Sequence, residues 1–254
     1  MLRLFSFKQR VQHDFSAAAQ HYDHVALLQR QVAKSLAHQA VAASRELHQK
    51  NPVWLDMGCG TGFVEQALHD LRFDTELLSF DLSLPMCNVH GKAINADMEY
   101  VPVGNGKCNG VLSSMAIQWV PQPLKVWNEM ARVLEPGGFC LIAVPAENTL
   151  HELVKTYQAC GLQQPVYDFS LPYLGEVNAL FKEVEIRHEI IKWHYPDVMA
   201  LLRSIKQVGA RHKAQAQTLT RGQFKALETY YRQHFADDKG IIATWDICFI
   251  KGYV

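Results

Sequence analysis

The chain has 254 residues, 48% of them apolar and 20% charged, and its 25 Lys and Arg residues balance 25 Asp and Glu residues. This composition is typical of an ordered globular protein, and the length suits one α/β domain with additional helices. Because the net charge is zero, no overall field favours a nucleic acid or an anionic membrane as partner. The six cysteines lack C-x-x-C spacing, which indicates reduced thiols rather than a disulfide framework or a zinc site.

The beginning of the chain is a poor secretory signal, because Arg3, Lys8 and Arg10 interrupt its apolar residues. No uninterrupted apolar run approaches the roughly 18 residues that a membrane span needs. We therefore expect a cytoplasmic protein that binds neither membrane nor nucleic acid.

The first fifty residues predict helices. Residues 9–48 contain no proline or glycine and are rich in Ala, Gln, His and Leu, which favours two helices with a break near residues 22–24. Residues 53–55 then form a short apolar strand candidate that runs directly into a glycine cluster, and helical spacing resumes over 62–71. We expect residues 1–49 to form a helical lid.

The rest of the chain predicts a doubly wound α/β fold. Apolar runs at 77–80, 111–113 and 139–144 alternate with helix-like segments such as 121–134. This alternation predicts a mostly parallel sheet covered on both faces, with ligands at the carboxyl ends of the strands. Later segments predict helices at 149–160, 197–208 and 220–235, a Pro-containing segment at 165–175, and strands at 184–193 and 241–250. We expect a single domain over 1–254, with residues 195–236 as a helical cap.

The strongest motif is an acid followed by three glycines at alternate positions, Leu55-Asp56-Met57-Gly58-Cys59-Gly60-Thr61-Gly62. Glycines permit a tight strand-to-helix turn and let the backbone approach a ligand. The spacing differs from the nicotinamide pattern G-x-G-x-x-G, and Asp56 would repel a pyrophosphate. S-adenosylmethionine (SAM) has no phosphate, and a carboxylate can attract its cationic methionine moiety. At this motif the chain resembles the class I SAM-dependent methyltransferases; a structural glycine turn in another α/β protein is the alternative.

Two further acids follow predicted strands. Asp81 ends the second apolar run, where an acid can accept both ribose hydroxyls of an adenosyl cofactor. A helix N-cap is the alternative role, and the two roles are compatible. Asp97 and Met98 follow a predicted third strand, and the resemblance implies that they contact the adenine amino group and the adenine ring.

Four segments resemble the malonyl-acyl-carrier-protein O-methyltransferases of biotin synthesis, and together they extend over about residues 10–250. They are Phe15–Asp23 with Leu28–Gln31, Asp81–Met86, Ala116–Trp119, and Arg203–Lys206 with Gly209-Ala210 and Leu219–Arg221. The resemblance implies a seven-stranded Rossmann-like sheet, SAM as the cofactor and malonyl-loaded acyl carrier protein as the partner. It adds Leu82, Met86 and Ser114 to the cofactor-binding residues. The implied reaction methylates the free carboxyl of the malonyl thioester, early in the synthesis of the pimeloyl part of biotin.

Several positions depart from the pattern of that family. Asn109 stands where an Asp is usual, Ser114 where an Asn is usual, Val144-Pro145 where Ser or Thr is usual, and Gln207 where a Gly is usual. These departures leave another small-molecule methyltransferase of the same fold as an alternative function. A catalytically silent SAM-binding partner protein is a second alternative.

The implied chemistry favours a cation rather than a base in the acceptor site. A carboxylate acceptor is already ionised at neutral pH, so catalysis can rest on positioning and on excluding water. Arg203, Lys206 and Arg211 are the candidates to hold that carboxylate. Tyr22 is the expected lid residue, with a hydroxyl and an aromatic face for a cation; packing between the N-terminal helices is its alternative role.

The segment between Asp197 and Glu228 contains basic residues but no acid. A basic cap could steer an acidic acyl carrier protein into place, and a solvated helix face is the alternative. His21 and His24 share a helical spacing that sometimes binds metal, but no acidic or cysteine ligands of matching spacing accompany them. We therefore expect no metal site.

Overall fold

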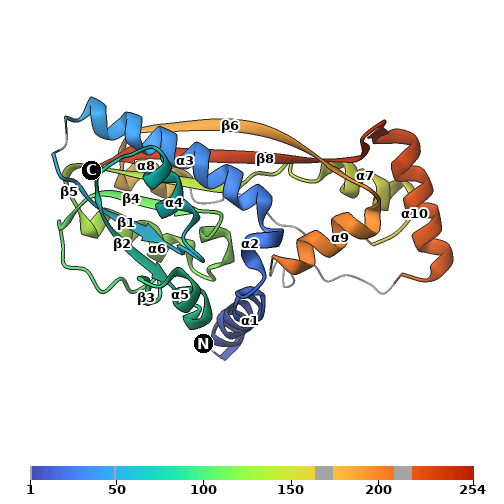
Figure 1. Ribbon diagram of the computed structural model, residues 1–254, viewed down its shortest axis with the longest axis horizontal. Helices are drawn as coiled ribbons and strands as arrows, with labels where there is room; N and C mark the ends of the chain where they lie inside the picture. Colours follow the sequence, from blue (N-terminus) through green and yellow to red (C-terminus); the bar gives the residue numbers. More distant parts are fainter. Residues whose placement is uncertain (1, 49, 164–173, 209–218) are drawn as a thin grey trace.

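The computed structural model describes residues 2–48, 50–163, 174–208 and 219–254, and a single mixed sheet forms its centre (Figure 1). The strands are β1 (Val53–Met57), β2 (Glu76–Asp81), β3 (Ile94–Asn95), β4 (Cys108–Ser114), β5 (Leu134–Pro145), β6 (Lys182–Tyr195), β7 (Ala236–Asp237) and β8 (Gly240–Tyr253). Their order is β3-β2-β1-β4-β5-β8-β6, and β7 pairs with β8 outside this path. The predicted seven-stranded path is confirmed, and the two-residue β7 is an additional strand.

The first five strands pair in parallel, whereas β8 runs antiparallel to both of its neighbours, β5 and β6. The helices are α1 (Leu2–Ala18), α2 (Tyr22–Val25), α3 (Leu27–Glu46), α4 (Phe63–Asp70), α5 (Leu84–His90), the 3-10 turn η1 (Ile117–Trp119), α6 (Pro123–Val133), α7 (His151–Ala159), α8 (Leu174–Leu180), α9 (Val198–Gln207) and α10 (Arg221–His234). Among the described segments, none is a helix long and apolar enough to cross a bilayer.

Both faces of the sheet are buried. On β5, Phe139 and Leu141 belong to a cluster with α3, α4 and α7, whereas Cys140 and Ile142 belong to a second cluster with α6 and α8. Side chains that alternate between two apolar layers explain why the strand appears in the sequence as a continuous apolar run. The predicted doubly wound fold is confirmed.

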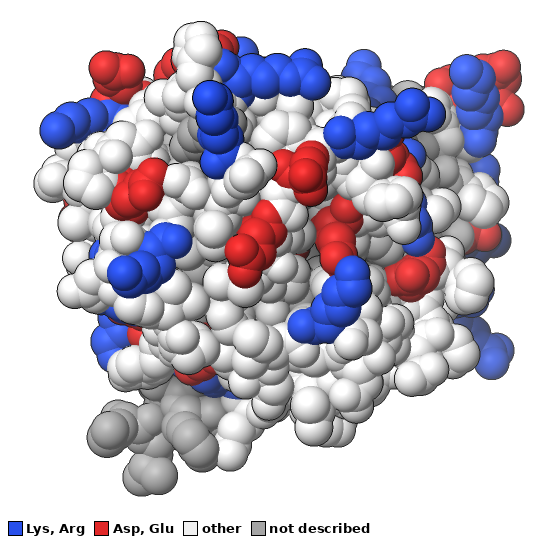
Figure 2. Space-filling model, turned by 60° about the vertical axis from the view of Figure 1, so that its left-hand side comes forward, with Lys and Arg blue, Asp and Glu red and all other residues white. Residues whose placement is uncertain are grey.

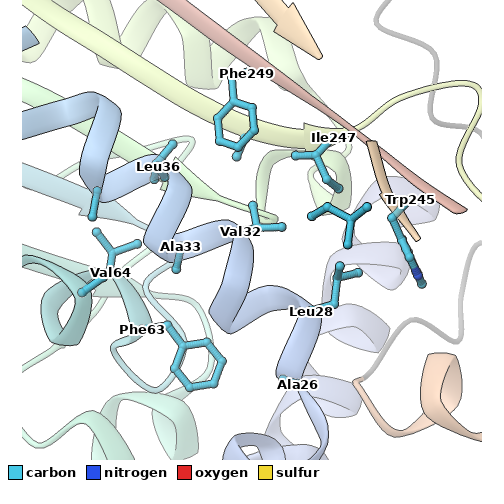
Figure 3. Packing of buried hydrophobic residues seen from close by; sticks show 14 of the residues in the cluster. Ala26, Leu28, Val32, Ala33, Leu36, Phe63, Val64, Trp245, Ile247 and Phe249 are labelled. Atoms are coloured by element: carbon cyan, nitrogen blue, oxygen red, sulfur yellow. The ribbon is translucent and has the colours of Figure 1, made fainter. Parts of the chain in front are cut away.

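Helix α3 crosses one face of the sheet and buries residues spaced about four apart, among them Leu28, Val32 and Leu36. Figure 3 shows the helix packed between Phe63 and Val64 of α4 and the side chains of β8. This spacing forms one apolar stripe on a 3.6-residue helix. The stripe fixes the N-terminal helices against the sheet.

The N-terminal helices differ from the prediction in one detail. The expected break near residues 22–24 separates the long helices α1 and α3, but it is divided in two: residues 22–25 form the short helix α2, and the chain leaves helical geometry at residues 19–21 and at Ala26. The turn is held by backbone hydrogen bonds, including that from the Ala26 N–H to the Tyr22 carbonyl. A short helix thus places Tyr22 beside the sheet.

Helices α9 and α10 lie in the connection between β6 and β8, at the end of the molecule where β6 terminates (Figure 1). Asp197 caps α9 by accepting a hydrogen bond from the Ala200 N–H, and Thr220 and Gln223 form a capping box at the start of α10. Helix α2 contacts α9, so the two ends of the chain meet over the same edge of the sheet. The division into a lid at 1–49 and a cap at 195–236 stays a prediction, and most of the segment 165–175 lies outside the described residues.

Candidate functional site

A pocket enclosing about 920 Å³ of empty space, part of it open to solvent, lies at the carboxyl ends of β1, β2 and β4. Small-molecule sites are typically about 300–1,000 Å³. We call it the cofactor pocket. Its wall brings together most of the residues predicted from sequence: Tyr22, Asp56, Gly58, Gly60, Asp81, Leu82, Met86, Asp97, Met98 and Ser114.

The glycine loop needs its glycines for space and backbone geometry. Gly58 has φ +77°, and a Cβ there would lie 2.5 Å from the Ala116 Cβ. Gly60 lies in the pocket wall, and a Cβ at this position would extend into open space. Gly62 is not part of the wall: it precedes α4, and a Cβ there would meet the His90 ring at 3.0 Å. The loop therefore exposes backbone to the pocket at Gly60, whereas Gly62 allows the turn into α4.

Asp56 contributes a completely buried carboxyl group to the pocket wall. Neither of its oxygens has a hydrogen-bond partner among the described residues. Burial, with the nearby Asp81 and Glu65, raises the pKa of Asp56 to about 8. A buried acid without a partner is costly, and a cationic ligand would relieve that cost.

Asp81 is held in place by backbone donors. Its Oδ1 accepts the Ser83 N–H at 2.7 Å and its Oδ2 accepts the Gly60 N–H at 2.9 Å. Burial raises the pKa of Asp81, and these two hydrogen bonds oppose the rise. The N-cap of α5 is Ser83, whose Oγ accepts the Met86 N–H, so the alternative cap role for Asp81 is wrong. Each carboxylate oxygen keeps further lone-pair capacity for a ligand in the pocket.

At another part of the wall, Asp97 and Glu99 share the ammonium group of Lys8 on α1. The Lys8 Nζ lies 2.5 Å from Asp97 Oδ2, and it also bonds Glu99, which is only 4% exposed. Burial lowers the pKa of Lys8, but the hydrogen bonds to both carboxylates outweigh it and raise the pKa overall. The sequence reasoning treated Lys8 only as a charge that breaks a signal peptide and missed it as a pocket residue.

Helices α1 and α2 are fastened to the loops that carry the acids. Gln12 Nε2 donates to the Leu82 carbonyl at 2.8 Å, and Ser16 Oγ lies 3.0 Å from Ser83 Oγ. On α2, Asp23 accepts a hydrogen bond from Thr61 Oγ1 in the glycine loop at 2.6 Å. These bonds hold the N-terminal helices against the cofactor pocket.

Tyr22 lines the cofactor pocket, and its ring stacks on Phe63 of α4 with centroids 5.8 Å apart. Burial and the neighbouring Asp81 and Asp23 raise the pKa of Tyr22, so its hydroxyl keeps its proton. Tyr22 thus lines the pocket and packs against α4 rather than between the N-terminal helices, and its role as a lid residue stays a prediction.

A second pocket, enclosing about 480 Å³ of empty space, borders the first. The two share five wall residues: Phe15, Tyr22, Gln29, Met115 and Trp119. The described wall of the second pocket continues with Gln118, Pro145, Leu150, Ile205, Val208 and Trp245. It is mostly apolar, and no charged side chain occurs among these wall residues. We call this second pocket the acceptor chamber.

The predicted cations Arg203 and Lys206 lie on the exposed side of α9 and outside the described walls of both pockets. The described wall of the acceptor chamber instead contains Ile205 of α9 and Val208, the residue directly after this helix. Helical periodicity separates the two sets of residues. Arg211 lies outside the described residues. Contact of Arg203 or Lys206 with an acceptor carboxylate stays a prediction.

The departures from the family pattern fall in different places. Asn109 lies near the amino end of β4, where its Oδ1 accepts the Val53 N–H at 2.7 Å and its Nδ2 donates to Glu135. Asn109 therefore links β4 to its neighbours β1 and β5, at the end of the sheet opposite to the pocket. Ser114 lines the cofactor pocket, with a buried Oγ that has no partner among the described residues, and Pro145 lines the acceptor chamber.

The residues of the cofactor pocket fit SAM. Asp56 offers an uncompensated carboxyl to a cation, and Asp81 offers a fixed carboxylate to hydroxyl groups. Met86 and Met98 add apolar surface for a flat ring, and Asp97 offers a carboxylate nearby. An amino acid joined to an adenosine has this combination of cation, hydroxyls and ring. Among the described residues, no group of three or more His, Cys, Asp or Glu side chains could hold a metal ion.

Comparison with known proteins agrees with this geometry. A model of the methyltransferase domain matches residues 55–142. In solved structures the fold is similar to the YcgJ protein of Bacillus subtilis, with TM-score 0.56 and 16% identity over 80% of this chain and 92% of that chain. It is also similar to a SAM-dependent methyltransferase of Thermotoga maritima, with TM-score 0.53 and 15% identity over 96% and 99% of the two chains. At these identities the structures establish the fold.

Sequence relatives extend the likeness to the whole chain. A malonyl-[acyl-carrier protein] O-methyltransferase of Alcanivorax borkumensis is 29% identical over 97% of this chain and 86% of its own length. The biotin biosynthesis bifunctional protein BioHC of Teredinibacter turnerae is 29% identical over 98% of this chain, which spans only 47% of that larger protein. The malonyl-[acyl-carrier protein] O-methyltransferase of Serratia marcescens is 31% identical over 88% of both chains. With this likeness and a pocket suited to SAM, the chain is a SAM-dependent methyltransferase and belongs to the malonyl-[acyl-carrier protein] O-methyltransferase family.

Proposed function

We propose that this enzyme methylates the free carboxyl of malonyl-acyl carrier protein, early in the synthesis of the pimeloyl part of biotin, in the cytoplasm. The observation that carries the proposal is a SAM-type pocket that joins an apolar second pocket, in a chain similar over most of its length to enzymes of that name. Masking the carboxylate as an ester turns a charged acyl group into one that resembles a fatty-acid chain.

Bound SAM supplies an electrophilic methyl group on a cationic sulfur. In this proposal, Asp56 holds the methionine amino group, Asp81 holds the ribose, and Asp97 with Met98 holds the adenine. The N-terminal helices exclude water from the transfer path through Phe15 and Tyr22. The acceptor carboxylate needs no base, so the protein contributes position and surroundings rather than proton transfer.

Arg203 and Lys206 remain the proposed cations on the substrate side. Their exposure on α9 makes them accessible to an arriving carrier protein. Arg221 and Lys225 are exposed on α10 and share a helix face four residues apart. On the face drawn in Figure 2, in contrast, Lys and Arg side chains stand among Asp and Glu side chains. The acidic carrier protein is the proposed partner of the basic α9–α10 surface.

The direct test is methyl transfer from labelled SAM to malonyl-acyl carrier protein, with acetyl-acyl carrier protein as the control that lacks a free carboxyl. We expect label only in the malonyl form, as a base-labile ester. Transfer to neither, with SAM still bound, would remove this substrate and leave another methyl acceptor or a silent SAM-binding protein.

A further inference from the structure

We infer that the acceptor chamber binds the malonyl end of the thioester and that Ile205 limits the length of the acyl group. This inference rests on the proposed function and adds the part of the protein that selects the acceptor. The chamber is the second pocket defined above, bordered on the cofactor side by Phe15, Tyr22 and Trp119.

The shared wall determines where the methyl group crosses. Residues that line both pockets must lie at their junction, and three of the five are aromatic. Phe15 and Trp119 pack edge to face, with ring centroids 5.7 Å apart and planes at 71°. Tyr22 is supported from behind by Phe63. Aromatic faces of this kind attract a cationic sulfur and exclude water from the point of transfer.

The wall beyond the junction is buried and apolar. Leu150, Ile205 and Trp245 are at most 7% exposed and belong to the large core cluster on that face of the sheet. Leu150 immediately precedes α7, and the other two residues lie on α9 and on β8. Close-packed side chains of the core move little to accommodate a larger ligand, so this wall limits the size of the acyl group that fits.

The chemistry suits an uncharged chamber. A carboxylate oxygen of the acceptor forms the new O–CH₃ bond while the sulfur–methyl bond breaks toward sulfur. One negative and one positive charge disappear, no proton moves, and the products are a neutral ester and a neutral thioether. Surroundings of low polarity favour that loss of charge, and Gln29 and Gln118 provide neutral hydrogen-bonding groups in the described wall.

Two opposite substitutions at Ile205 test the inference, with Met199→Phe as the matched control because Met199 lies on the exposed side of the same helix. Ile205→Phe fills the chamber and Ile205→Ala enlarges it. We measure SAM binding by calorimetry and kcat/KM for malonyl- and glutaryl-acyl carrier protein. We also follow the binding of malonyl-pantetheine in the presence of S-adenosylhomocysteine by tryptophan fluorescence, since Trp119 and Trp245 lie in the wall.

We expect Ile205→Phe to lower kcat/KM for the malonyl substrate at least about 10-fold, with the Kd for SAM changed by less than about twofold, since one methylene in an apolar pocket can change kcat/KM 10–200-fold. Ile205→Ala should raise the glutaryl-to-malonyl ratio by about 10-fold or more. Met199→Phe should behave as wild type. Retention of SAM binding shows that the variants are folded.

Suppose that wild type methylates malonyl-acyl carrier protein, but that neither Ile205 variant changes the methylation rate or the preference for acyl length. The assignment of the chamber as the malonyl site is then wrong, and the proposed function stands. If wild type methylates no malonyl substrate, the proposed function fails and malonyl-pantetheine binding decides about the chamber. If malonyl-pantetheine binds and Ile205→Phe weakens that binding, the inference about the chamber is supported. If malonyl-pantetheine does not bind, or binds equally well to Ile205→Phe, the inference is overturned.

Discussion

The carboxyl group of Asp56 is fully buried beside a second acid, and its pKa lies near 8 rather than near its ordinary value of 3.8. Between these two values the folded protein without cofactor binds a proton that the unfolded chain does not. The contribution of Asp56 to stability therefore falls as the pH rises from about 4 to about 8. An ammonium ligand favours the ionised form, so SAM binding should release a proton in this window and tighten as the pH approaches 8.

Substitution Asp56→Asn removes that charge while keeping the shape. A hydrogen bond to a charged group contributes about 1.5–3 kcal/mol, so the Kd for SAM should rise roughly 10- to 100-fold. Without cofactor, the free energy of unfolding of the variant should no longer show the decrease between pH 4 and 8 that Asp56 causes in wild type. Calorimetry in two buffers of different ionisation enthalpy measures the proton release. The same release from wild type and from Asp56→Asn would exclude Asp56 as its source.

Lys8 connects α1 to the proposed adenine end of the pocket, through Asp97 and the buried Glu99. Lys8→Met leaves Glu99 without its cation, which should lower the free energy of unfolding by about 1–3 kcal/mol. It also frees α1 from the pocket, so SAM should dissociate faster in stopped-flow measurements. Lys92→Met, at an exposed lysine paired with Glu65, is the control. Lys8→Arg should restore slow dissociation, and equal dissociation rates in Lys8→Met and wild type would contradict the role of α1.

These residues show what the sequence could predict. Asp56 and Asp81 lie at the carboxyl ends of the parallel strands β1 and β2, and Asp97 follows β3. Local pattern and the general rule for such sheets therefore bring them to one edge. Lys8 lies 89 positions from Asp97, and nothing in the local pattern of α1 indicates that contact. Arg203 and Lys206 were selected by charge, whereas the structure turns their apolar neighbours inward.

At the scale of elements, α10 begins with the capping box of Thr220 and Gln223, and its buried Leu227 and Tyr231 pack into the core cluster. Thr220→Ala removes the cap and should cost about 1 kcal/mol, a fall in Tm of about 2–4 °C for a chain of this size. Thermal unfolding measures it. Thr229→Ala, at an exposed position within the same helix, should leave Tm unchanged or raise it slightly. A fall of the same size in both variants would argue against capping as the cause.

A helix or strand could be predicted where burial gives a long segment a regular pattern of apolar residues. Strands β5 and β8, buried on both faces, appear as apolar runs, and α3 shows an apolar stripe. Short elements lack such a signal. Helix α2 has four residues and no buried one, and β7 has two residues that depend on pairing with β8. Their positions follow from tertiary contacts, which a local pattern does not contain.

The whole molecule joins segments from both ends of the chain around the edge of the sheet. The shared junction takes Phe15 and Tyr22 from the N-terminal helices and Trp119 from η1, and the chamber beyond it takes Ile205 and Trp245 from the last fifth of the chain. In the proposed reaction, methyl transfer therefore requires both ends of the chain, because the glycine loop contributes only part of the cofactor pocket and none of the described wall of the chamber.

The basic α9–α10 surface yields a prediction about the whole molecule and its partner. The double variant Arg221→Glu, Lys225→Glu should raise KM for malonyl-acyl carrier protein roughly 10-fold at low salt, because two attractive charges become repulsive. Its KM should depend less on salt than that of wild type, and KM for malonyl-coenzyme A, which lacks the acidic protein, should change little. Lys34→Glu, Lys50→Glu makes the same change in net charge at exposed residues in the N-terminal part of the chain. An equal rise in KM for both double variants would attribute the effect to net charge and remove α9–α10 as the docking surface.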